Sequence, residues 1–182
     1  MNKQKPNAAH SKSLWITETA ILIALLVGLQ FATKSLGQYV TGSCVNAVLA
    51  IAALVAGLSS GLTVAILSPF FAFLLGIGPQ LLPIVPAISV GNAIFVLVLY
   101  LVTGQGGISV ARGIGAWLSA ALAKSAVLYL LVVQVLCRIL TLKDVQIALF
   151  TSMFSVNQLI TALIGGGVAL LLTPILRKAL HR

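Results

Sequence analysis

Long apolar runs, separated by short polar or Gly- and Pro-rich breaks, follow one another along almost the whole chain. A helix needs about 20 mainly apolar residues to cross the hydrocarbon core of a bilayer, and the breaks mark where one helix ends and the next begins. This pattern predicts six membrane spans, at residues 14–32, 45–58, 62–77, 84–102, 114–136 and 147–172. The second and third are short, and Ser59, Ser60 and Gly61 between them predict a tight hairpin of tilted helices.

Composition indicates the same class of protein. Hydrophobic residues make up 60% of the chain and charged residues 7%, whereas about a quarter of an ordinary soluble domain is charged. We therefore expect an all-α integral membrane protein that forms one compact helical bundle over residues 14–176, with basic tails at 1–13 and 177–182. The first apolar run is as long as a span and lacks a clear small-residue cleavage site, so we interpret it as a retained helix.

The distribution of positive charge predicts the orientation. Six spans place both termini on the same side of the membrane. With that side cytoplasmic, the inner segments hold Lys3, Lys5, Lys12, Arg112, Arg177, Lys178 and Arg182, and the outer segments hold Lys34, Arg138 and Lys143. This bias follows the positive-inside rule and predicts an N-in, C-in topology. Because the net charge of +9 gathers at the chain ends, it indicates a membrane anchor and not nucleic-acid binding.

Two outer segments have the features of a binding-site entrance. Residues 33–44 are predicted to form a loop in which hydrogen-bonding side chains lie near hinge-capable glycines: Lys34, Gln38, Tyr39, Thr41 and the nearby Asn46, around Gly37 and Gly42. Such a loop either closes over a polar molecule or is an ordinary connector anchored by Tyr39. Residues 76–86 are rich in Gly and Pro and predict a stiff non-helical turn that forms a cavity wall.

Polar residues within the predicted spans gather near the outer ends. Ser89 and Asn92, for example, share one face of the fourth span. The predicted binding residues combine this set with the outer loops: Gln38, Tyr39, Asn46, Gln80, Ser89, Asn92, Gln134, Arg138, Ser155, Asn157 and Gln158. Neutral donors and acceptors suit a small heterocyclic or amide-bearing solute, with Arg138 or Lys34 available for an anionic group. For the amides of the sixth span, hydrogen bonds that stabilise the bundle are the alternative.

Lys124 is the one charged residue near the middle of a predicted span. A charge at this depth costs a few kcal/mol or more unless it is hydrated or paired. No acid lies at the centre of a neighbouring span, because Glu18 is near the inner end of the first span and Asp144 lies outside. The roles that remain open for Lys124 are a neutral amine, a group in a water-filled cavity, a partner for a substrate carboxylate and a contact with another subunit.

The sequence lacks the groups that enzymes and self-driven transporters use. Its two acids are far apart and its two His lie near the termini, so no catalytic residue, metal site or bound cofactor is expected. It has neither a phosphate-binding loop ending in Gly-Lys-Ser/Thr nor a series of intramembrane acids for ion coupling. If the chain moves a solute, another protein must supply the energy. A disulfide between Cys44 and Cys137 is sterically conceivable, and plain packing is the more common role for such residues.

Small residues recur every four positions on the first span, at Ala20, Ala24 and Gly28. This spacing lets another helix approach closely. The stripe therefore indicates either a docking surface for a partner protein or close packing within the bundle.

With these features the chain resembles the substrate-binding S components of bacterial energy-coupling factor (ECF) vitamin transporters. The resemblance rests on the six predicted helices, the basic chain ends, the Ala-x-x-x-Ala motif at Ala20 and Ala24, and the long first outer loop. The stretches at residues 37–42 and 69–79 look like those of members assigned to hydroxymethylpyrimidine, pyridoxine or pantothenate.

The resemblance implies a multi-pass protein of the bacterial cell membrane that binds a small vitamin from outside. The first loop then closes, and the subunit topples against a transmembrane T subunit coupled to two ATPases, which use ATP. Ala20, Ala24 and Gly28 would contact the T subunit, and the first loop with the polar span ends would hold the vitamin. Lys124 departs from the family pattern and favours an acidic vitamin such as pantothenate, whereas the amide-rich remainder favours a neutral pyrimidine or pyridine.

Two other functions stay open on the sequence. The chain is either a self-sufficient small secondary transporter or channel, in which Lys124 carries a proton, or a structural membrane protein without a ligand. Dependence of uptake on partner ATPases separates the first of these from an S component.

Overall fold

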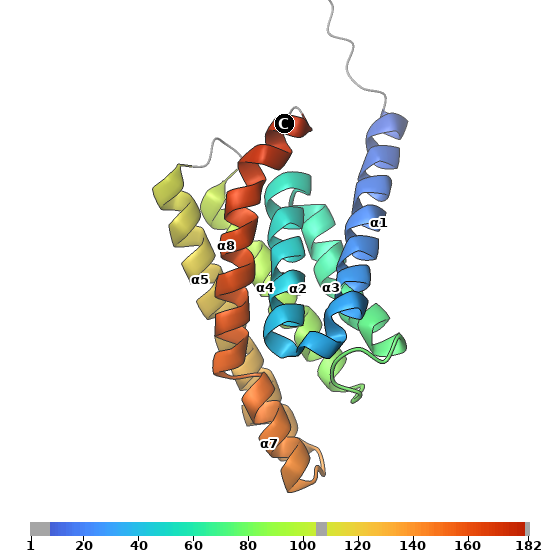
Figure 1. Ribbon diagram of the computed structural model, residues 1–182, viewed down its shortest axis with the longest axis vertical. Helices are drawn as coiled ribbons and strands as arrows, with labels where there is room; N and C mark the ends of the chain where they lie inside the picture. The colour runs from blue at the N-terminus through green and yellow to red at the C-terminus, as the bar shows by residue number, and fades with distance from the viewer. Residues whose placement is uncertain (1–7, 105–108, 181–182) are drawn as a thin grey trace, which may run out of the picture.

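The computed structural model describes residues 8–104 and 109–180, and every regular element in them is helical (Figure 1). Lys3, Lys5 and Arg182, which the orientation prediction uses, lie outside the described residues. The elements in chain order are α1 (Ala8–Thr33), the 3-10 turn η1 (Lys34–Leu36), α2 (Gln38–Ile51) with its π-helical extension η2 (Ala52–Ala56), α3 (Leu58–Leu74), α4 (Ile84–Thr103), α5 (Val110–Leu128) continuing through the π-helical η3 (Tyr129–Leu136) into α6 (Cys137–Ile139), α7 (Asp144–Met153) and α8 (Val156–Ala179).

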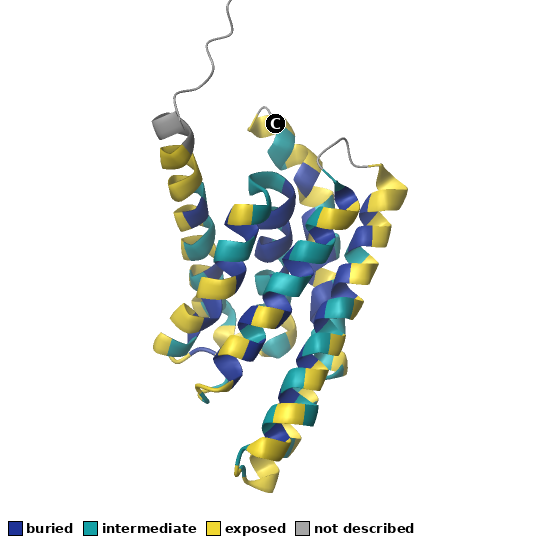
Figure 2. Cartoon of the chain, turned by 180° about the vertical axis from the view of Figure 1, so that it is seen from behind, coloured by how far each residue is buried: buried dark blue, intermediate teal, exposed yellow. Residues whose placement is uncertain are grey.

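Within residues 8–104 and 109–180, five helical stretches are long and apolar enough to cross a membrane, and α3 is a shorter apolar helix of 17 residues. The five are Lys12–Leu36, Gln38–Ala56, Ile84–Thr103, Val110–Ile139 and Asp144–Ala179. Large apolar side chains such as Ile21, Leu122 and Leu171 are exposed on the outer faces of the helices, while the buried residues face inward (Figure 2). Such a surface is typical of a protein whose outer faces contact lipid. The all-helical class is confirmed, the helices are long and apolar enough to be compatible with a multi-pass membrane protein, and the count of six spans stays a prediction.

The helices pack in a closed ring in the order α1, α2, α8, α5, α4, α3. Large buried side chains, among them Leu26, Leu49 and Phe95, fill its interior. The closest approach is between α2 and α8, where a Cβ on Gly165 would lie 2.3 Å from the carbonyl oxygen of Ser43. Only a residue without a side chain fits this crossing, so Gly165 brings the polar residues of α2 and α8 together.

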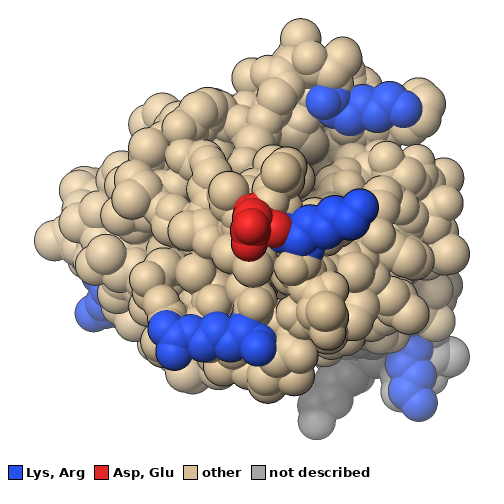
Figure 3. Space-filling view, turned by 90° about the horizontal axis from the view of Figure 1, so that it is seen from below, with Lys and Arg blue, Asp and Glu red and all other residues tan. Residues whose placement is uncertain are grey.

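The beginning of α1 and the end of α8 lie at the same end of the ring (Figure 1). We call this the terminal end, and the opposite end, where α1 joins α2, the cavity end. The pair formed by η3 and α7 extends beyond the other helices there. Seen from the cavity end, the surface is mostly uncharged, with scattered basic side chains and an acidic one (Figure 3).

Two predicted loops do not lie at the residues that the sequence indicated. Residues 33–44 form no long loop, because η1 and a sharp turn at Gly37 (φ 87°) lead directly into α2, where the amide of Thr41 donates to the Gly37 carbonyl at 3.1 Å. The turn between the second and third spans lies at Gly57 (φ 94°) and not at residues 59–61, which belong to α3. A positive φ costs glycine little, and for this reason the chain reverses at Gly57 and not at the serines.

The Gly- and Pro-rich connection between α3 and α4 is non-helical, as predicted, with positive φ at Gly76 and Gly78. The predicted sixth span is not one continuous helix. A turn at Phe154 and Ser155 separates α7 from α8, and α8 continues to Ala179.

Candidate binding site

Lys124 lies in α5, near the middle of the Val110–Ile139 stretch, and is 2% exposed. Its ammonium nitrogen donates to Asn46 Oδ1 on α2 at 2.6 Å and to Asn92 Oδ1 on α4 at 2.7 Å. The amide nitrogen of Asn46 donates in turn to Thr161 Oγ1 on α8 at 3.3 Å. One buried network therefore joins four helices of the ring. It includes a lysine side chain that would be costly to bury without hydrogen-bond partners.

The two asparagine oxygens orient the Lys124 side chain but do not form an ion pair with it. They carry only partial negative charge, and within the described residues no carboxylate forms a salt bridge with Lys124. The ring of Phe95 lies with its centroid 5.5 Å from the nitrogen and adds a weak cation–π contact. The site therefore holds a buried amine that has no carboxylate partner in the described part of the chain.

A cavity of about 260 Å³ borders this network at the cavity end of the ring. Its polar lining is Gln30, Lys34, Gln38, Thr41, Asn46, Asn92, Lys124 and Gln158. Its apolar lining includes Val45, Ile77, Ile88, Met153 and Phe154. A cavity of this size, somewhat below the usual range of about 300–1,000 Å³, suits a small ligand with an apolar body and a few polar groups.

Several predicted residues meet in this cavity. They are Gln38, Asn46, Asn92 and Gln158, together with both predicted anion partners, Lys34 and Lys124. Gly78 and Pro79 also line it, so the Gly- and Pro-rich turn does form a wall as predicted. Gln38 is held in place by a hydrogen bond of 2.7 Å from its amide nitrogen to the carbonyl of Met153.

Other predicted residues lie outside the cavity lining, and most have structural partners. Ser89 donates to the Ile66 carbonyl at 3.0 Å and so links α4 to α3. The Tyr39 hydroxyl donates to Asn157 Oδ1 at 2.7 Å and links α2 to α8, the alternative role considered for Asn157. Gln134 of η3 accepts a hydrogen bond from Arg138 of α6. Gln80 is exposed on its loop, and Ser155 lies in the turn before α8.

Sequence reasoning missed the apolar lining and two polar residues of the site, Gln30 and Thr161. Gln30 lines the cavity from α1, and Thr161 supports Asn46 from α8. The available signal for Gln30 was an amide within an otherwise apolar run. Thr161 carried no such signal, because a lone threonine in a membrane helix commonly bonds to its own backbone.

The small residues of α1 face away from the ring. Ala20, Ala24 and Gly28 are exposed, and a Cβ on Gly28 would meet nothing within 4 Å. The packing face of α1 is instead formed by residues such as Thr19 and Leu26. Close packing of the stripe within the bundle is therefore wrong. Cys44 and Cys137 are free thiols, so the conceivable disulfide is not formed.

The chemistry that the cavity offers is hydrogen bonding and positive charge. In residues 8–104 and 109–180, no group of three or more His, Cys, Asp or Glu side chains is placed to hold a metal ion. No family model, curated protein or solved structure matches the chain.

Proposed function

We propose that this chain is the membrane-embedded substrate-binding subunit, or S component, of an ATP-driven ECF vitamin importer in a bacterial cell membrane. The observation that carries the proposal is the buried Lys124, held by Asn46 and Asn92 in the wall of a ligand-sized cavity. A membrane protein without a ligand has no evident use for a buried lysine without a carboxylate partner beside a cavity, since an apolar residue would pack there at lower cost.

The lining matches a small water-soluble vitamin or precursor. The ammonium of Lys124 donates to a ring nitrogen, an oxo group or a carboxylate, and the amides of Gln38 and Gln158 supply both donors and acceptors. The apolar side chains Ile88 and Phe154 suit the faces of a heterocycle. Hydroxymethylpyrimidine or pyridoxine is the favoured ligand, and pantothenate is next because its carboxylate would neutralise Lys124.

The energy for transport comes from partners in this proposal. The exposed stripe of Ala20, Ala24 and Gly28 is the surface on which a transmembrane T subunit packs, with two ATPases attached to it. The terminal end, which holds the described basic residues Lys12, Arg112, Arg177 and Lys178, is the cytoplasmic end. The cavity end then faces outward, where it meets the vitamin.

The direct test is equilibrium binding of a vitamin panel to the purified, detergent-solubilised chain. The panel contains hydroxymethylpyrimidine, pyridoxine, pantothenate, riboflavin, folate and biotin. Saturable submicromolar binding of one compound by the folded protein supports the proposal and identifies the substrate. Failure of every compound to bind refutes vitamin capture, and uptake that persists without partner ATPases indicates a secondary transporter instead.

A further inference from the structure

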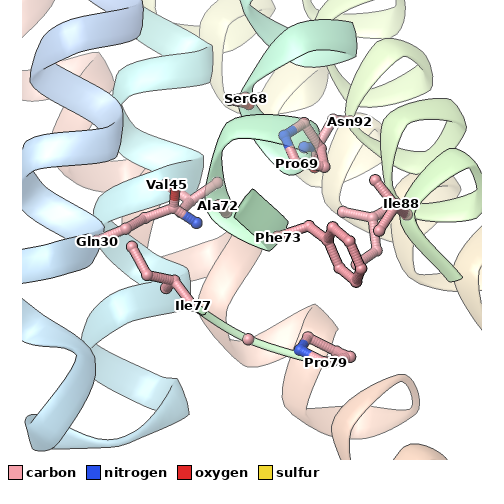
Figure 4. Close-up of a pocket in the computed structure, with 12 residues that line it drawn as sticks. Gln30, Val45, Ser68, Pro69, Ala72, Phe73, Ile77, Pro79, Ile88 and Asn92 are labelled. Carbon is pink, nitrogen blue, oxygen red and sulfur yellow. The ribbon is translucent and has the colours of Figure 1, made fainter. Parts of the chain in front are cut away.

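A second, smaller cavity of about 80 Å³ adjoins the first one. We call it the inner chamber. It shares Gln30, Val45, Ile88 and Asn92 with the larger cavity, as well as residues 77–79, and it extends to α3. Figure 4 shows Ser68, Pro69, Ala72 and Phe73 of α3 opposite Gln30 of α1 and Ile88 of α4. The shared walls place the inner chamber beside the Lys124 network, with Asn92 bordering both.

Two residues that line this chamber each carry a buried side-chain oxygen without a hydrogen-bond partner. Among the described residues, the buried side-chain oxygen and nitrogen atoms without a hydrogen bond are Gln30 Oε1 and Ser68 Oγ. Ser68 is 1% exposed. Leaving a buried polar atom unsatisfied costs roughly 1–3 kcal/mol. Both unsatisfied atoms belong to residues that line the same small chamber, so the chamber calls for a polar occupant.

Ser68 differs from several other hydroxyl residues in these helices. Ser43, Thr63, Thr103, Ser125 and Thr173 each donate to the carbonyl four residues earlier. This is the usual way in which a membrane helix satisfies a hydroxyl. Ser68 makes no such bond, and it precedes Pro69, whose missing N–H deprives the Ala65 carbonyl of its helical donor. Ser68 is therefore a hydroxyl residue on the α3 side of the chamber whose own helix does not satisfy it.

We infer that the inner chamber is a second part of the ligand site and takes a hydroxyl-bearing arm of the ligand. This inference rests on the proposed function and specifies its substrate class. A hydroxyl donates to Gln30 Oε1 and accepts from the hydroxyl of Ser68, whereas a carboxylate has no proton to donate to Gln30. An aliphatic amine is protonated at neutral pH and would place a positive charge beside the amine of Lys124, with no carboxylate among the residues that line either cavity. The matching ligand has an electron-rich group at Lys124 and a hydroxyl on the opposite arm.

The test compares each panel compound that carries an alcohol hydroxyl with its analogue in which hydrogen replaces one hydroxyl, such as hydroxymethylpyrimidine and its methyl counterpart. The wild-type chain is expected to bind the hydroxyl compound about tenfold or more tightly, because the analogue leaves buried polar groups unpaired. Ser68→Ala is expected to reduce this preference to about threefold or less. Ser125→Ala is the matched control, because its hydroxyl bonds to its own helix and Ser125 lines neither cavity.

The outcomes separate this inference from the proposed function. Equal binding of the hydroxyl and deoxy compounds by the wild-type chain overturns the inference and leaves vitamin capture intact. A preference that persists in Ser68→Ala overturns the role of Ser68. Absence of binding by every compound refutes the proposed function and this inference with it. If Ser68→Ala fails to fold, the wild-type comparison still decides whether the ligand's hydroxyl is recognised.

Discussion

The ammonium nitrogen of Lys124 donates a hydrogen bond to Asn92 Oδ1 across 2.7 Å, from α5 to α4. Asn92 also lines both the larger cavity and the inner chamber. This bond therefore connects Lys124, near the middle of the Val110–Ile139 stretch, to Asn92, the residue of this pair that lines both cavities. A ligand in either cavity would therefore lie beside the same hydrogen-bond network.

Replacing Lys124 with Met is expected to weaken vitamin binding without unfolding the protein. Hydrogen bonds to charged groups contribute about 1.5–3 kcal/mol, so affinity should fall roughly 10- to 150-fold. Thermal stability should fall, because Asn46 Oδ1 and Asn92 Oδ1 stay buried after they lose their hydrogen-bond donor. Calorimetric titration and thermal unfolding in detergent measure the two effects. Lys143→Met, at an exposed position outside the cavity, serves as the control, and an equal loss of affinity in it would contradict the prediction.

The Lys124–Asn92 bond should appear as a coupling energy. Asn92→Ala in the wild-type chain removes one of the two oxygen partners of the ammonium and is expected to cost about 1.5–3 kcal/mol. In the Lys124→Met background the same change should cost less, since the charge is gone. A double-mutant cycle of reversible unfolding in mixed micelles gives the difference. Additive effects within about 0.5 kcal/mol would show that the bond does not stabilise the bundle.

Gly165→Ala is expected to disrupt the crossing of α2 and α8. The added Cβ would lie 2.3 Å from the Ser43 carbonyl oxygen and 2.7 Å from the Ala47 nitrogen, so the helices must separate. Overpacking of this kind costs about 1–3 kcal/mol, and vitamin affinity should fall as Asn46 moves. Gly115→Ala on α5 is the matched control, because its Cβ would meet nothing within 4 Å. Comparable melting temperatures for the two variants would argue against a close crossing.

Ala24→Trp is expected to abolish vitamin uptake in cells while leaving vitamin binding by the purified chain unchanged. The bulky side chain would fill the exposed stripe on α1 and prevent close approach of the T subunit. Co-purification with the T subunit and ATPases, alongside uptake of labelled vitamin, measures the effect. The control Leu122→Trp lies at an exposed position on α5. Normal uptake by Ala24→Trp would place the partner contact elsewhere.

The helical character and the long apolar helices could be predicted from the sequence because they depend on local features. A run of apolar residues must satisfy its backbone internally in lipid, and a helix does so within one segment. The same reasoning identified Lys124 as an unusual charge and the turn at residues 76–86 as a cavity wall. It failed for residues 33–44, where polarity indicated a loop although Gly37 alone makes the turn and helical hydrogen bonds resume at once.

Tertiary structure alone decided which polar groups meet. Lys124 is separated along the chain by 78 residues from Asn46 and by 32 from Asn92, and no spacing rule connects them. Gln30 and Ser68 border one chamber only because α1 and α3 are neighbours in the ring. In a bilayer the outer faces of helices are as apolar as the inner ones, so hydrophobicity does not specify how each helix is rotated. That rotation depends on close crossings such as Gly165 against Ser43 and on the few buried hydrogen bonds, and both exist only in the packed bundle.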